Sequence, residues 1–151
     1  MEETVERRLE RLGIELPAAS EPAANYANVV RVHNLLFVAG KGPAGNPEGK
    51  LGIQFSTAEG YRYARSAGIE VLAVLKQELG SLDRVQRVVK LQGYVNADVS
   101  YTEHHLVLNG CSDLMRDVFG ERGVHSRSVM GASSLRDNLP LVIDSIFACS
   151  Q

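Results

Sequence analysis

Cysteine is scarce in this chain of 151 residues, which holds only Cys111 and Cys149. The two are far apart and unpatterned, which excludes a disulfide framework and a zinc motif. Long apolar runs are also missing, since no stretch approaches the roughly 20 residues of a membrane-spanning helix. The charged start, MEETVERRLERLG, has no apolar centre of the kind that secretory signals carry. We therefore expect a cytoplasmic protein with no metal and no membrane contact.

An excess of basic residues is missing too. Sixteen Lys and Arg residues stand against 18 Asp and Glu, for a net charge of −2 and a pI of about 6.1. Binding to phosphate backbones depends on a positive field, so this balance argues against a nucleic-acid partner. The remaining composition, 44% hydrophobic and 23% charged, is that of an ordinary globular protein. The length suits one domain over residues 1–151 that buries its own core.

Hydrophobic periodicity and turn residues divide the chain into alternating helices and strands. We expect an N-terminal helix within residues 1–13, and a hairpin of 28–32 and 35–39 turning at His33-Asn34. Further along we expect a strand at 50–55, helices at 56–79 and 100–119, and strands at 84–96, 126–134 and 139–149. This order predicts an α+β domain, with a sheet that carries two long helices on one face.

Finer patterns specify faces and helix ends. Two capping boxes, Ser56–Glu59 and Ser100–Glu103, are expected to open the two long helices. In the strand 84–96 one face is expected to carry Val85, Val89, Leu91 and Val95. In the second helix the inward residues are expected to be Leu106, Leu114, Met115 and Val118.

The last two strands are expected to pair as a hairpin across the turn-rich loop 135–138. That register sets Arg127 opposite Ile146 and Val129 opposite Asp144, so Arg127 and Asp144 become diagonal neighbours on one face. Such neighbours are roughly 7–8 Å apart at the backbone, close enough for long side chains to share a pocket. His125 and Ser133 are expected on the same side.

Asp144 is the only charged residue in the apolar strand LPLVIDSIFAC. A buried carboxylate is costly without a partner, so it needs Arg127, solvent or a ligand. Its face also carries Val142, Ile146 and Ala148, which is too apolar for open solvent. We expect another copy of the chain to cover this face, with a small-ligand pocket between the subunits.

Several segments resemble the RidA/YjgF family of enamine/imine deaminases, most closely its branch of short RidA-like proteins of undefined role. The resemblance runs in register from about residue 12 to the closing strand, through PAANYANVVRVHNLLFVAGKGP, STAEGYRYARSAG, LDRVQRVVKLQGYVN and NGCSDLMRDVFGERGVHSRSVMGASSL. It implies a chorismate-mutase-like fold and a homotrimer with ligand clefts between subunits. It also implies hydrolysis of 2-imino acids to 2-keto acids and ammonia, without a cofactor.

The resemblance also assigns residues to the cleft. Arg127 matches the arginine that binds the substrate carboxylate, and the main-chain carbonyl of Val129 matches one that contacts the attacking water. Asp144 stands where the family has a water-positioning Glu, and Ala39 where it has a Ser. The cleft wall and a close backbone approach to the ligand are matched by Tyr26 and Gly40.

Each candidate also has a structural role that the sequence leaves open. Arg127 and Asp144 are equally readable as an ion pair, and Tyr26 as a packing residue. His125 lines the pocket by parity, or else lies at the surface. Asn109 either faces the cleft or belongs to an Asn-Gly pair that packs closely against a neighbouring copy.

Two functions therefore compete. One is the deamination of small 2-imino acids, and the other is non-catalytic binding of small carboxylate metabolites by the same trimer. The shorter Asp144 favours the second, because an error of about 1 Å in position can cost roughly 10²-fold in rate. A ribonuclease or translation-inhibitor role, often attached to this family, is disfavoured by the acidic balance.

Overall fold

The computed structural model describes residues 2–151. Its α-helices are α1 (Val5–Arg11), α2 (Thr57–Leu79) and α3 (His104–Phe119). Its strands are β1 (Val29–Val32), β2 (Leu35–Lys41), β3 (Val85–Asn96), β4 (Ser126–Ala132) and β5 (Leu141–Cys149). Short 3₁₀ turns are η1 (Leu82–Arg84), η2 (Gly120–Gly123) and η3 (Arg136–Asn138).

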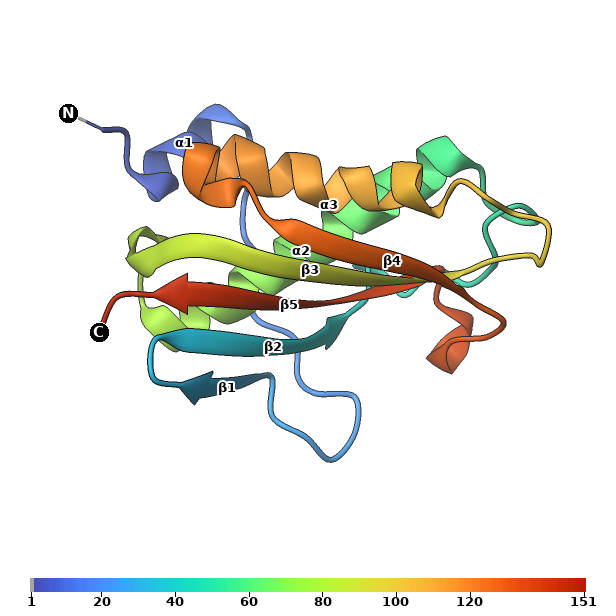
Figure 1. The fold of residues 1–151 in the computed structure, drawn as a ribbon, viewed down its shortest axis with the longest axis horizontal. Helices are drawn as coiled ribbons and strands as arrows, with labels where there is room; N and C mark the ends of the chain where they lie inside the picture. The colour runs from blue at the N-terminus through green and yellow to red at the C-terminus, as the bar shows by residue number, and fades with distance from the viewer. Residues whose placement is uncertain (1) are drawn as a thin grey trace.

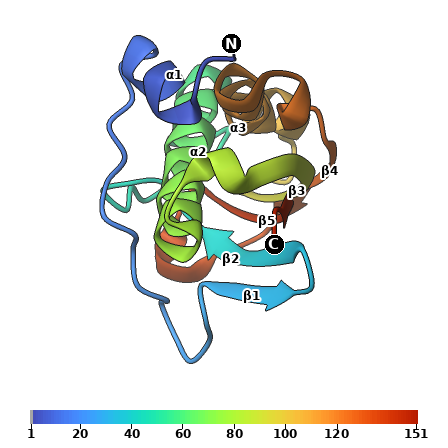
Figure 2. The same cartoon turned by 90° about the vertical axis from the view of Figure 1, so that its left-hand side faces the viewer.

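The strands form one mixed sheet in the order β1-β2-β5-β3-β4. β3 and β4 are parallel, and the other neighbours are antiparallel. Helices α2 and α3 lie together on one face of this sheet (Figure 1). Seen from the end, they form a layer on one side, and none of the helices in residues 2–151 covers the other side (Figure 2). The predicted α+β architecture with two long helices on one face is confirmed.

The N-terminal helix and the first hairpin also form as predicted. α1 buries Val5 and Leu9, and its Glu6 pairs with Lys76 of α2 at 2.6 Å. The β1–β2 hairpin turns at His33-Asn34, and His33 takes a positive φ of 55°. A two-residue hairpin turn requires that conformation.

Helices α2 and α3 cross very closely, and glycine permits it. A Cβ at residue 110 would lie 2.0 Å from the carbonyl oxygen of Tyr61 on α2. The expectation that Gly110 packs against a neighbouring copy is therefore wrong, because its close contact lies within the chain. The capping box that opens α2 is confirmed, with Ser56 and Glu59 bonded reciprocally.

The short strand expected at 50–55 is absent. The carbonyl of Lys50 accepts hydrogen bonds from the amides of Gln54 (3.0 Å) and Phe55 (3.1 Å), so the chain folds back in a tight turn. Gly52, with φ of 87°, supplies the left-handed residue. The segment makes two isolated bridge pairings, Leu51 with Phe55 and Leu51 with Ala97.

The second capping box does not form either. Ser100 bonds Asp98 instead, and α3 begins at His104 after an N-cap, Glu103, that makes no side-chain capping bond. Leu106, in the first turn of α3, is 39% exposed, so the expectation that it points inward is wrong. Leu114, Met115 and Val118 are buried as predicted.

Two register shifts interrupt the expected alternation of β3. They fall between Val85 and Arg87 and between Val88 and Lys90. A bulge adds a residue and reverses the parity of the side chains that follow. Val88 is consequently buried, and Val89 is only half-buried.

The predicted terminal hairpin is wrong, because β4 and β5 do not pair. β4 runs parallel to β3, while β5 inserts between β2 and β3. Parallel neighbours need a long crossover, and α3 supplies it between β3 and β4. The apolar β5 takes a central position, and the more polar β4 becomes an edge strand. Among residues 2–151 no helix is long and apolar enough to cross a membrane.

Replacing Gly110 by Ala is expected to destabilise the fold by about 2 kcal/mol, measured by chemical denaturation. Alanine should favour a helix by about 1 kcal/mol over glycine, but the new methyl group would meet backbone that cannot swing aside. The adjacent, half-buried Asn109→Ala is the control and should change stability by less than about 0.5 kcal/mol. Equal stability of G110A and the wild type would contradict this account of the helix crossing.

Candidate functional site

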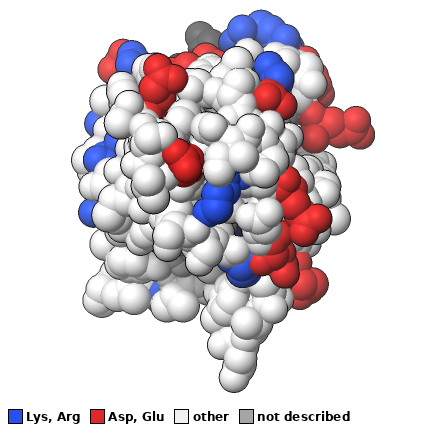
Figure 3. All heavy atoms as spheres, turned by 90° about the vertical axis from the view of Figure 1, so that its right-hand side faces the viewer, with Lys and Arg blue, Asp and Glu red and all other residues white. Residues whose placement is uncertain are grey.

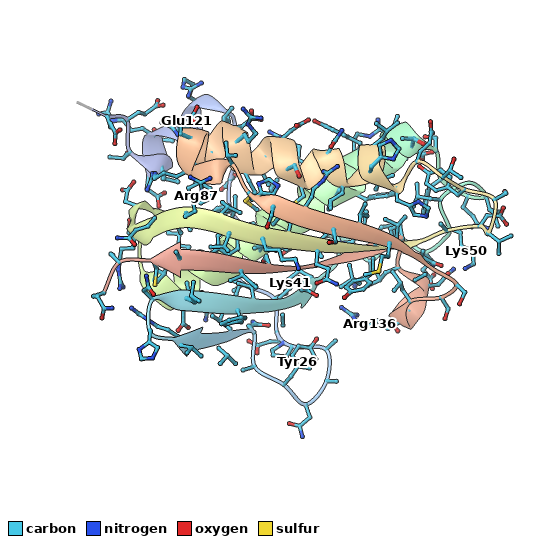
Figure 4. The ribbon with its side chains drawn as sticks, viewed as in Figure 1. Tyr26, Lys41, Lys50, Arg87, Glu121 and Arg136 are labelled. Carbon is cyan, nitrogen blue, oxygen red and sulfur yellow. The ribbon has the colours of Figure 1, made fainter. Side chains whose placement is uncertain are left out.

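Within one chain, the predicted site residues fall on three separate parts of the sheet. Arg127 and Val129 lie on edge strand β4, and Asp144 lies on the central strand β5. Tyr26, Ala39 and Gly40 lie at the opposite edge, by β1 and β2. Figure 4 shows Tyr26 in the loop before β1, far across the sheet from β4.

Arg127 points to the helix side of the sheet and is half-buried under α3. Its Nη1 donates to the Ser112 hydroxyl oxygen at 2.9 Å, and its Nη2 donates to the His105 carbonyl oxygen at 2.9 Å. A guanidinium has five N–H donors, so hydrogens remain for a ligand. No carboxylate within residues 2–151 forms an ion pair with it.

Ser112 links Arg127 to a histidine. The Ser112 hydroxyl lies 2.9 Å from Nε2 of His125, and the His125 Nδ1 lies 2.6 Å from the carbonyl oxygen of Gly123. Burial lowers the pKa of His125, and the positive charges of Arg127, Arg116 and Arg87 lower it further, against the opposing effect of the Gly123 carbonyl. These effects favour the neutral form of His125, which lies beside the arginine on the helix side of the sheet.

Asp144 lies on the other face of the sheet. Paired residues share a face, and Asp144 stands in a row with Gln92 and Ser128, whereas Arg127 stands in a row with Leu91 and Ser145. The expectation that Arg127, His125 and Asp144 share one side is wrong within a chain, because β3 separates their strands and sets opposite parity.

The Asp144 carboxylate makes no hydrogen bond or ion pair with any other residue in the described range 2–151. Desolvation raises its pKa above the usual value, partly opposed by the positive charge of Lys90. The same face exposes apolar side chains, including Val30 (54%), Phe37 (41%) and Met130 (47%). A half-buried carboxylate among apolar neighbours is costly unless a cation, a hydrogen-bond donor or water contacts it.

The residues at the other edge form a hollow of about 430 Å³. Tyr26, Ala39 and Gly40 line it, together with Val30 and Phe37. Tyr26 is 43% exposed, and its hydroxyl oxygen accepts a hydrogen bond from the amide of Ala23 at 3.0 Å. Gly40 is needed here, because a Cβ would lie 2.6 Å from the Val142 side chain. Tyr26, Ala39 and Gly40, which the resemblance places in the cleft, are thus brought together in the chain.

Asn109 lies elsewhere. It lines a shallow hollow on the outer surface between α2 and α3, with Leu106 and Tyr61 among its neighbours. This position is distinct from the Arg127 cluster and from the Tyr26 hollow.

Sequence reasoning missed Ser112, which is 9% exposed and faces the sheet from α3. Its signal in the sequence was a polar residue on a helix face that otherwise carries the apolar Cys111, Leu114 and Met115. It missed Lys41 as well, which is 4% exposed and donates to Asn28 Oδ1 at 2.6 Å. No group of three or more potential metal ligands occurs among residues 2–151.

The mixed sheet, the helices on one face and the arginine at the β4 edge define an α+β domain of chorismate-mutase-like architecture. A family model described as "YjgF/chorismate mutase-like, putative endoribonuclease" matches residues 6–148. The chain belongs to this family, as the sequence resemblance predicted.

Individual proteins similar to this chain support the same family assignment. Protein TCP17 of Trypanosoma cruzi is 41% identical over 147 residues, which cover 94% of this chain and 92% of that protein. The crystal structure of Atu1372 from Agrobacterium tumefaciens, a protein of unknown function, has a TM-score of 0.89 at 36% identity, over 97% of this chain and 92% of its own. A structure from Shewanella oneidensis MR-1, described as a "putative endoribonuclease", has a TM-score of 0.93 at 32% identity, over 97% and 99%.

Replacing Asp144 by Asn is expected to raise the thermal unfolding midpoint at pH 7. The pKa of Asp144 is higher in the folded than in the unfolded protein, so the wild type loses stability as the pH rises from the unfolded-state pKa to the folded-state pKa. At about pH 3 the carboxyl group is protonated in both states, and the unfolding midpoints of the wild type and D144N should converge. Melts from pH 3 to 8 test this. A midpoint lowered by D144N at pH 7 would show that the carboxylate has a partner in the assembled protein.

Proposed function

We propose that this protein hydrolyses small 2-imino acids to 2-keto acids and ammonia, with Arg127 as the anchor for the substrate carboxylate. The supporting observation is the arginine itself. It is half-buried, held by Ser112 and the His105 carbonyl, and free of any carboxylate among the described residues. A guanidinium fork so positioned suits bidentate binding of a carboxylate.

The cleft is proposed to form between copies of the chain, as in a homotrimer. Arg127 lies at one edge of the sheet and the hollow of Tyr26, Ala39 and Gly40 at the opposite edge, so contact between edges of two copies would complete a walled site. The exposed apolar face that carries Phe37 and Met130 supports association. In such a cleft Asp144 would act only if a neighbouring copy supplied it.

No catalytic metal or cofactor is needed for this reaction. A protonated imine is already electrophilic, so the protein has to hold the carboxylate, exclude bulk water and direct one water molecule to the imine carbon. The Val129 carbonyl, two residues beyond Arg127 on β4, is the proposed second contact of that water.

Non-catalytic binding of small carboxylates is the second candidate function. It is favoured by the position of Asp144, which lies on the face opposite to Arg127 within the chain. Cleavage of RNA has less support. The chain has a net charge of −2, and basic side chains are scattered rather than joined in a stripe on the face seen in Figure 3.

The role of Arg127 is tested with an imine generated in place by an amino-acid oxidase, following keto-acid release above the protein-free rate. Arg127→Ala should lose about 10²-fold in kcat/KM, since charged hydrogen bonds contribute about 1.5–3 kcal/mol each. The kcat/KM of Arg127→Lys should lie between those of the wild type and R127A, because lysine keeps the positive charge but cannot make the two parallel hydrogen bonds of a guanidinium. Arg65→Ala, which removes a half-buried arginine of α2 that pairs with Asp117 rather than with Ser112, is the control.

Calorimetric titration with pyruvate decides the alternative. Binding that needs Arg127, without turnover, would establish the second function. If the protein neither binds pyruvate nor turns over the imine, both proposed functions are dismissed.

The proposed assembly predicts a mass near three times 16.4 kDa in light scattering coupled to gel filtration. Phe37→Asp should shift the protein to monomers, because it places a charge within the apolar face. Val99→Asp, at a residue 97% exposed in the loop before α3, is the matched control and should leave the mass unchanged. A monomeric wild type would remove the basis for a cleft between copies.

A further inference from the structure

The hydrogen bonds around Ser112 have a defined direction. A carbonyl oxygen only accepts, so the 2.6 Å contact with Gly123 requires a hydrogen on Nδ1 of His125. In the neutral ring Nε2 is then an acceptor, and it accepts from the Ser112 hydroxyl at 2.9 Å. Arg127 donates to the same hydroxyl oxygen at 2.9 Å. The chain of donors runs from Arg127 through Ser112 to His125 and the Gly123 carbonyl.

This arrangement matches that of a hydroxyl beside a general base. A side-chain base within hydrogen-bond reach of a hydroxyl, and itself oriented by a third group, is the usual geometry for proton transfer. The orienting group here is the main-chain carbonyl of Gly123, in η2. Its position depends on tight packing, because a Cβ at residue 123 would lie 2.2 Å from the carbonyl oxygen of Met115.

The structure of a 2-imino acid requires the general base to lie close to Arg127, which anchors the carboxylate. In a 2-imino acid one C–C bond joins the carboxylate to the reacting carbon, so a base must lie within a few Å of the guanidinium that holds the carboxylate. Ser112 meets this condition at 2.9 Å from Arg127, whereas Asp144 of the same chain lies on the other face of the sheet.

We propose that Ser112 and His125 form a proton relay that opens beside Arg127 and deprotonates the water attacking the imine carbon. This inference rests on the proposed deaminase function and deepens it. Water forms the new C–O bond while one of its protons passes to the Ser112 oxygen, and the Ser112 hydroxyl hydrogen passes to Nε2. The electron pair of the C=N bond moves to nitrogen, which yields a neutral carbinolamine and a protonated His125.

The return path completes the balance. Protonated His125 gives its proton back through Ser112 to the amine nitrogen, the C–N bond breaks, and the relay takes the hydroxyl proton as C=O forms. Ammonia then accepts that proton, so water and the protonated imine become keto acid and ammonium. Ser112 can serve both directions, because its oxygen can accept from Arg127 and from a protonated His125 while its own hydrogen turns outward.

The charges around His125 suit a base that is neutral before the reaction. Arg127 of β4, Arg116 of α3 and Arg87 of β3 all disfavour its protonation, and the Gly123 carbonyl of η2 favours it. A substrate carboxylate on Arg127 would neutralise the nearest of these charges. Substrate binding should therefore strengthen the base.

The first test is kinetic and uses the full chain. The wild-type kcat should rise with pH along a limb set by His125. His125→Gln keeps an acceptor near the Nε2 position but takes up no proton near neutral pH, so it should lose that limb and about 10²-fold in kcat, with KM little changed. Ser112→Ala should match it, and the double variant should be no slower than either single one.

Two kinetic results would overturn the relay. One is H125Q with wild-type kcat and pH profile. The other is a loss of turnover in Asp144→Asn that H125Q does not share, which would assign the base to a neighbouring copy.

The second test needs no turnover and no variant, so it separates failure of the relay from failure of the proposed function. Nitrogen NMR of the four histidines should show His125 as the Nδ1–H tautomer. The pKa of His125 should lie below the ordinary value for a histidine and should rise when pyruvate is added. A tautomer with hydrogen on Nε2, or a pKa that pyruvate leaves unchanged while it binds, would overturn the relay.

Discussion

Strand β4 pairs with β3 in parallel, and the crossover that this pairing requires is helix α3. The helix therefore lies directly over the edge strand that carries Arg127. The long side chain of Arg127 reaches up to Ser112 and to the His105 carbonyl rather than out to solvent. The surroundings of Arg127 follow from that pairing, since an antiparallel β4–β5 hairpin would have set Arg127 beside Asp144 instead.

The close crossing of α2 and α3 is the second condition for the site. Gly110 brings the backbones of the two helices together and so sets the position of α3 beside α2. In this position Ser112, two residues along, is within 2.9 Å of both Arg127 and His125. A small change in the helix position would break both contacts. The packing of α3 therefore positions Ser112 for its hydrogen bonds with Arg127 and His125.

Local signals in the sequence were sufficient where the structure is decided within a few residues. The two-residue turn at His33-Asn34, the capping box at Ser56 and the N-terminal helix all form as predicted. Residues 50–55 were misjudged because a short apolar run does not distinguish a strand from a turn when glycine permits a left-handed backbone. The bulges of β3 were not visible because the adjacent Val88 and Val89 are both apolar, so the pattern alone does not show which of them faces the core.

Periodicity and motifs along the chain were enough to predict the class of fold and the family, because both are local properties of the sequence. Which strand lies next to which, and so which face each side chain occupies, depends on how the elements pack in three dimensions. A turn-rich loop such as 135–138 fits either a hairpin or a longer connection, and the choice depends on where an apolar strand can be buried on both faces. That choice set Asp144 apart from Arg127 and brought Ser112 and His125 to it.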